Sequence, residues 1–136
     1  MRPALCLLAA LAVGLLAVGC SSGPPRFQTR GRVLKDGQPF HPPGDDVIRV
    51  TLIPITEDGG RAEDWYVANF NREDATFRVV GKDGRGVPPG KYRVGVEQVH
   101  NRDDVFKGAY FGDKSPYVRE IRSASDEITI DLAKRE

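Results

Sequence analysis

The stretch GVPPGKYRVGVEQV, residues 86–99, decides the fold because two prolines and a glycine stand directly before alternating side chains. Pro88 and Pro89 each fix the backbone angle φ near about −65°. Gly90 permits a turn that other residues make with difficulty. Tyr92 is then the first inward residue of a strand, with valines following at every second position.

Two interpretations of this stretch compete. Adjacent prolines can form a polyproline helix that docks into an aromatic groove. Alternatively, the stretch turns the chain into a strand, and Tyr92 returns its hydroxyl to the backbone upstream as a tyrosine corner. We favour the corner, because only two prolines are present and a patterned strand follows. We expect the Tyr92 hydroxyl to bond the carbonyl of Pro88.

The rest of the chain also alternates with a period of two, and no segment has a clear apolar stripe at helical spacing. Turn dipeptides such as Asp36-Gly37, Asp58-Gly59 and Asp83-Gly84 separate the alternating runs. The expected strands are Gly31–Lys35, Ile48–Ile53, Asp64–Phe70, Thr76–Val80, Tyr92–Glu97, Tyr117–Ile121 and Glu127–Leu132. About seven short strands without a helix predict an all-β, immunoglobulin-like Greek-key β-sandwich.

Three stretches resemble the carboxypeptidase regulatory-like, or transthyretin-like, domains of bacterial envelope lipoproteins. These are GRVLKDGQPF (31–40), ATFRVVGKDGRGVPPGKYRVGVE (75–97) and ITIDLAK (128–134). The chain departs from the family pattern at Ala75, where the family has a glycine, and at an inserted HPPGDD (41–46). The resemblance implies a seven-stranded, transthyretin-like sandwich and an accessory or adhesive role. It implies no enzymatic activity.

The N-terminus predicts export and a lipid anchor. One basic residue precedes the uncharged run Ala4–Val18, whose 15 residues are shorter than a membrane-spanning helix and suit a signal peptide. Val18-Gly19-Cys20 then resembles a bacterial lipobox, although Ala17 stands where leucine is preferred. A soluble secreted protein, or an uncleaved anchor, is the alternative. We expect residues 1–19 to be the signal peptide, with Cys20 lipidated.

The expected mature chain has three parts: lipidated Cys20, a proline-bearing tether to residue 29, and one domain over 30–136. Loss of Arg2 leaves 19 basic and 19 acidic residues, which argues against a nucleic-acid partner. The acyl chains would hold the protein at a membrane of the cell envelope, facing the periplasm or the cell surface. We favour the outer membrane because Ser21 lacks the aspartate associated with inner-membrane retention.

No cofactor or metal site is expected. Some bacterial adhesins of this kind form isopeptide bonds, and the nearest trio is Lys35, Glu97 and Asp131. Strand alternation places Glu97 and Asp131 on solvated faces, which argues against that bond. Asp45-Asp46 and Asp103-Asp104 could supply oxygen ligands to a weak calcium site, but the calcium-loop series is absent. His41 and His100 lie in separate loops, which argues against zinc.

The sequence contains no catalytic pattern: it lacks a G-x-S-x-G elbow and a phosphate-binding glycine loop, and Cys20 is the expected lipid site. We therefore expect a non-enzyme that binds another envelope protein or serves structurally. The alternative is a carbohydrate-binding module that uses aromatic side chains of the irregular region 100–117. The candidate binding residues there are Arg102, Phe106, Tyr110, Phe111 and Tyr117.

These aromatic rings have a second interpretation, which we favour. The loop folds back and packs the rings over an open end of the sandwich, because large aromatic side chains are usually mostly buried.

Trp65 and Tyr66 are adjacent on one expected strand, so they point to opposite faces. We expect one of the two to pack inside and the other to be exposed.

Overall fold

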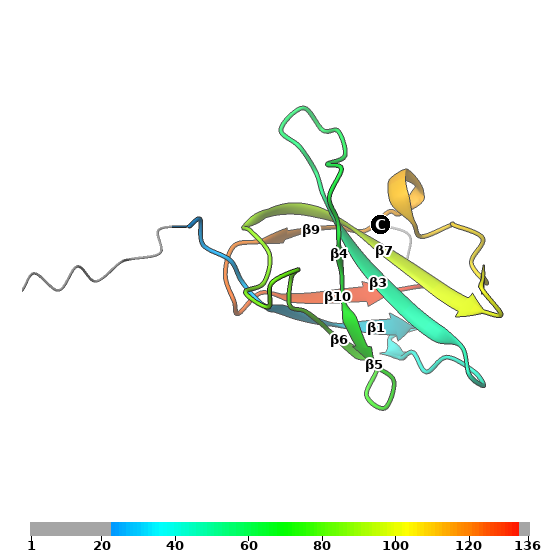
Figure 1. Ribbon diagram of the computed structural model, residues 1–136. Helices are drawn as coiled ribbons and strands as arrows, with labels where there is room; N and C mark the ends of the chain where they lie inside the picture. Colours follow the sequence, from blue (N-terminus) through cyan, green and yellow to red (C-terminus); the bar gives the residue numbers. More distant parts are fainter. Residues whose placement is uncertain (1–22, 134–136) are drawn as a thin grey trace, which may run out of the picture.

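The computed structural model describes residues 23–133. The predicted signal peptide and Cys20 lie outside the described residues. The described chain is almost entirely β-structure, and its strands form two sheets that pack face to face (Figure 1). This arrangement confirms the all-β sandwich expected from the alternating pattern.

The first sheet has the strand order β10-β1-β6-β5, with β2 pairing β1. The second has the order β4-β3-β7-β8, with β9 also pairing β7. Neighbouring strands are antiparallel except β1 and β10, which are parallel. The elements are β1 (Thr29–Lys35), β2 (Gln38–Pro39), β3 (Val47–Pro54), β4 (Tyr66–Val67), β5 (Asn69–Asn71), β6 (Thr76–Val79), β7 (Gly90–His100), β8 (Asp103–Asp104), the 3₁₀ helix η1 (Gly112–Lys114), β9 (Val118–Ile121) and β10 (Glu127–Asp131).

One expected strand contributes to both sheets. The stretch 64–70 divides into β4, which pairs β3, and β5, which pairs β6. Ala68 lies between them, and its N–H still donates to the Val50 carbonyl at 2.9 Å. The prediction of a single strand over residues 64–70 was therefore wrong. The chain passes from one sheet to the other within this stretch, as strands at the corners of sandwiches do.

The folded domain begins earlier than expected. Phe27 makes an antiparallel bridge with Val87, donating to its carbonyl at 2.8 Å and accepting from its N–H at 2.9 Å. Thr29 is fully buried in β1. The predicted tether through residue 29 is therefore too long, because its last residues already pair with the rest of the domain.

The core forms from the alternate residues that the sequence pattern placed inward. Ile48, Val50 and Leu52 of β3 meet inward residues of the facing sheet, including Phe77 and Ile130. Thr51 and Ile53 lie on the opposite, outer face of the second sheet, as the alternation predicts.

The tyrosine corner is confirmed. The Tyr92 hydroxyl donates to the Pro88 carbonyl at 2.5 Å, and the Tyr92 side chain is buried beside Tyr66. Tyr66 is therefore the inward member of its pair, and Trp65 is exposed. The stretch 86–99 thus starts a central strand.

Asp131 contradicts the expectation of a solvated carboxylate, since it is buried. Its two oxygens accept from the backbone N–H groups of Gly37, at 2.9 Å, and Ala133, at 3.1 Å. The β1–β2 turn folds over this end of β10, which strand alternation alone does not reveal. The other two members of the trio considered for an isopeptide bond lie elsewhere. Glu97 is partly exposed and pairs with Arg49. The Lys35 ammonium lies over the Phe40 ring.

Candidate functional site

Three of the four Phe and Tyr side chains of the region 100–117, Phe106, Tyr110 and Tyr117, pack against one another and against the core. The Phe106 and Tyr110 rings meet edge to face with centroids 5.1 Å apart, and Tyr110 stacks on Tyr117 at 5.9 Å. Tyr117 is fully buried, and its hydroxyl donates to the Asp131 carbonyl at 2.9 Å. The Tyr110 hydroxyl donates to the Leu132 carbonyl at 2.9 Å. The preferred interpretation, that these rings extend the core, is confirmed for Tyr110 and Tyr117.

The other two candidates lie further out. Phe111 is half-buried and packs over the outer face of the second sheet at Gly95. Gly95 has no side chain there, so the ring approaches the sheet closely. Arg102 is exposed, next to Asn101 in the turn between β7 and β8. The structure therefore does not bring the five candidate residues together on one exposed surface.

Of the four carboxylates of the weak calcium hypothesis, Asp46 and Asp104 are engaged in local hydrogen bonds, and Asp45 and Asp103 are exposed. Asp104 accepts from the backbone N–H groups of Gln98, Phe106 and Gly108, at 3.2, 3.1 and 2.6 Å. These bonds hold the start of the irregular region in place. Within residues 23–133, no group of three or more His, Cys, Asp or Glu side chains is arranged to hold a metal ion.

Asp46 is buried at the same end of the sandwich. It accepts from the Gln98 amide at 2.5 Å and contacts the His100 Nδ1 at 2.5 Å. The hydrogen bond from Gln98, and then the one from His100, hold the pKa of Asp46 below its usual value. Arg72 stabilises the preceding loop by donating to the carbonyls of Pro42, Gly44 and Asp46. The inserted segment 41–46 is thus tied to the domain by polar contacts.

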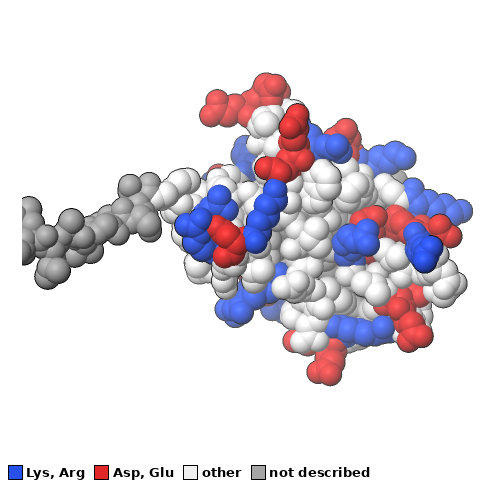
Figure 2. All heavy atoms as spheres, viewed as in Figure 1, with Lys and Arg blue, Asp and Glu red and all other residues white. Residues whose placement is uncertain are grey.

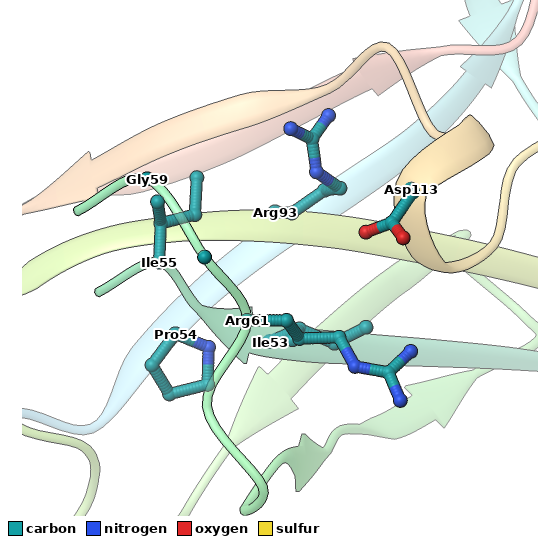
Figure 3. A pocket seen from close by; sticks show the side chains of 8 residues that line it. Ile53, Pro54, Ile55, Gly59, Arg61, Arg93 and Asp113 are labelled. Atoms are coloured by element: carbon teal, nitrogen blue, oxygen red, sulfur yellow. The ribbon is translucent and has the colours of Figure 1, made fainter. Parts of the chain in front are cut away.

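A cleft of about 390 Å³ lies on the outer side of the second sheet, between η1 and the loop that follows β3 (Figure 3). Ile53, Pro54 and Ile55 form its apolar part. Arg93 from β7 and Asp113 from η1 approach the same space (Figure 3). The Arg93 guanidinium is held by a bond to the Ser115 carbonyl at 2.7 Å.

Arg61 lines the other side of this cleft and is exposed. It has no hydrogen bond or ion pair with any residue of the described range. The cleft therefore combines an apolar wall with cationic groups and one carboxylate, which suits contact with a polar partner. Arg93 follows the inward Tyr92, so strand alternation puts it on the outer face. The sequence does not predict the cleft, since the segment 55–61 and η1 meet only in the folded chain.

The outer side of the second sheet also carries exposed apolar side chains. We call this surface the valine face and define it by Val47, Trp65, Val67 and Val118, which are 60%, 51%, 51% and 40% exposed. The pairing of Val67 with Thr51 and of Val118 with Arg93 places them on this side. Figure 2 shows a broad band of uncharged atoms across the side that β3 and β4 present.

No family model, curated protein or solved structure matches the chain. In the part of the chain that the structure describes, no helix is long and apolar enough to cross a membrane.

Proposed function

We propose that the protein is a lipid-anchored module of the cell envelope that binds another envelope protein through the valine face. The exposed apolar side chains carry this proposal: Trp65 and Val67 are neighbours at the edge of the second sheet, and each is about half exposed. Val47 and Val118 are exposed on the same outer side. Contiguous exposed apolar surface is typical of protein interaction sites. Arginine and aromatic residues, here Arg61, Arg93 and Trp65, are also enriched in such interfaces.

The proposed anchor rests on the sequence pattern of residues 1–20. A signal-peptide core followed by Gly19-Cys20 is typical of bacterial lipoproteins, and the resemblance to envelope transthyretin-like domains agrees with that location. The non-enzymatic role is supported by the chemistry of the cleft. Its lining combines arginines, one aspartate, glycines and apolar residues, and includes no serine, cysteine, histidine or lysine as nucleophile or base.

The carbohydrate-binding alternative depends on exposed rings in the region 100–117. Tyr117 is fully buried, and the hydroxyl of Tyr110 is bonded to the backbone of Leu132. A sugar-stacking platform needs free ring faces, and these two rings stack on each other instead. The packing of the loop therefore favours the protein-binding proposal.

Site-specific cross-linking in intact cells tests the protein-binding proposal. A photoreactive residue at Val67 should give one discrete cross-linked protein, whereas the same residue at Thr129, exposed on the other sheet, should not. Val67→Lys should abolish a cross-link formed from Val47, because a charge cannot be buried in an apolar contact without a partner. Equal cross-linking from Val67 and Thr129, or none from either, would show that the valine face is not the docking surface.

The anchor is tested separately by Cys20→Ser. The wild-type chain should incorporate labelled fatty acid and sediment with membranes, and the variant should do neither. Cys6→Ser is the matched control, because Cys6 lies within the proposed signal peptide. A Cys20→Ser protein that still sediments with membranes would contradict the lipid anchor.

A further inference from the structure

The outer face of the first sheet carries charged and polar side chains. Strand register arranges its side chains in two rows that cross four strands. Asn69, Arg78, Arg30 and Glu127 form the first row. Asn71, Thr76, Arg32 and Thr129 form the second. We call this surface the arginine face, and all of its members are at least partly exposed.

Two arginines on this face stand directly opposite each other without a carboxylate partner. Arg30 and Arg78 are register partners in the antiparallel pair β1–β6. Like charges in this position are destabilising. The nearest acid on the register is Glu127, but its carboxylate accepts from Arg32 instead, at 2.6 Å. Beyond the backbone pairing of the sheet, the side chains of Arg30 and Arg78 make no ion pair or hydrogen bond within residues 23–133.

The surface is also hollowed. A depression of about 430 Å³ lies over the two rows, and Arg30, Arg32 and Arg78 all line it. Asn69, Asn71 and Thr76 add amide and hydroxyl groups to this lining. Two carboxylates also line it, and both are engaged: Glu127 accepts from Arg32, and Asp74 accepts from the Thr76 hydroxyl at 2.6 Å. Residues on one face of a strand repeat about every 6.6–6.8 Å, and strands lie about 4.7–4.9 Å apart. The face therefore offers a regular grid of guanidinium, amide and hydroxyl groups to an extended ligand.

The chemistry of this grid selects one kind of ligand. Paired guanidinium groups recognise carboxylates through parallel N–H bonds. Asparagine and threonine side chains both donate and accept, which suits sugar hydroxyls. The two rows contain no aromatic side chain to stack a nucleic-acid base and no apolar side chain to enter a lipid bilayer. They also lack the apolar centre of a protein interface.

We propose that the arginine face binds an acidic polysaccharide that carries carboxylate groups. One carboxylate lies between Arg30 and Arg78 and neutralises their repulsion. The neighbouring hydroxyls bond to Asn71 and Thr76. This proposal is independent of the valine face, which lies on the other sheet.

Affinity electrophoresis of the full chain tests the proposal. Polygalacturonate in the gel should retard the protein, and dextran, which is neutral, should not. Arg30→Gln and Arg78→Gln should each weaken the retardation at least tenfold. Arg61→Gln, which removes an exposed arginine from the loop between β3 and β4, should have no effect. Added salt should weaken the binding, because ion pairs at a surface are screened.

A stability measurement separates a binding role from a structural one. Because Arg30 and Arg78 repel each other, Arg78→Gln should unfold at a temperature equal to or above that of the wild type. Loss of retardation without loss of stability supports the site. The proposal is overturned if polygalacturonate does not retard the wild-type chain, or if Arg30→Gln and Arg78→Gln are retarded like wild type. Tighter binding of polyphosphate or polyglutamate than of polygalacturonate would also overturn it.

Discussion

Gly31 lies in β1 directly between Phe77 of β6 and Ile128 of β10, its register partners in the same sheet. A Cβ atom at this residue would overlap the backbone carbonyl of Ile128 and the ring of Phe77. The backbone of β10 and a buried aromatic ring cannot both move aside in a close-packed core. The absence of a side chain at Gly31 is therefore a packing requirement of the β1–β10 pair.

Gly31→Ala should destabilise the domain by about 1–3 kcal/mol, because overpacking forces side chains and backbone out of position. Urea denaturation should show a lower midpoint with an unchanged slope. Gly23→Ala is the control, since a Cβ atom there meets no described atom within 4 Å. An unchanged midpoint for Gly31→Ala would mean that the strand pair is looser than described.

Tyr92 makes the free energy of unfolding depend on pH in the alkaline range. Burial raises the pKa of Tyr92 to about 12, above its ordinary value of about 10. The folded state therefore holds the phenolic proton more tightly than the unfolded state. The stability that this group contributes is complete below pH about 10 and is lost as pH rises towards about 12.

Tyr92→Phe should remove this part of the alkaline loss and cost about 0.5–1.5 kcal/mol at neutral pH, because the hydrogen bond to Pro88 is gone. Thermal unfolding of the wild type and variant from pH 7 to 11 measures both effects. The difference in unfolding temperature between the wild type and Tyr92→Phe should become smaller as the pH rises. A constant difference across that range would contradict a raised pKa for Tyr92.

At the scale of elements, the irregular region after β7 is held by one side chain. Asp104 accepts three backbone N–H groups, two of which belong to the segment that carries the aromatic stack. Asp104→Ala leaves these donors without that acceptor, and each unsatisfied buried group costs about 1–3 kcal/mol. We expect faster hydrogen exchange at the Phe106 and Gly108 amides. Asp103→Ala, which alters the exposed neighbouring carboxylate, should leave their exchange rates unchanged.

Alternation predicted the strands well because it reports which side chains are buried. It could not predict that the stretch 64–70 divides between the sheets, because a period of two does not say which neighbour a strand pairs with. Asp131 was placed in solvent for a related reason: the turn at Gly37 covers it, and that turn is close only in the folded chain. The cleft at Arg93 was missed because its walls come from three separate segments.

For the whole molecule, exposed apolar side chains lie on the outer side of the second sheet, and substitutions on the valine face should separate binding from folding. Val67 is half-exposed on the short strand β4 at the edge of its sheet. Val67→Lys should change the unfolding free energy by less than about 0.5 kcal/mol, as surface substitutions usually do. Circular dichroism during urea titration checks this expectation. A large loss of stability would assign the exposed valine a structural role and weaken its proposed role in docking.

The parallel pairing of β1 with β10 has a consequence for how the chain acquires its structure. Arg32 and Glu127 are 95 residues apart in sequence, yet they join across neighbouring strands. Closing so long a loop costs conformational entropy before any contact compensates for it, and non-local pairing slows folding. During N-to-C synthesis or translocation, β1 can pair with β2 and β6 early, but its other edge stays unpaired until β10, near the end of the domain, has been made. The early strands are therefore exposed to aggregation until the last one is added, and this interval is where a chaperone would act.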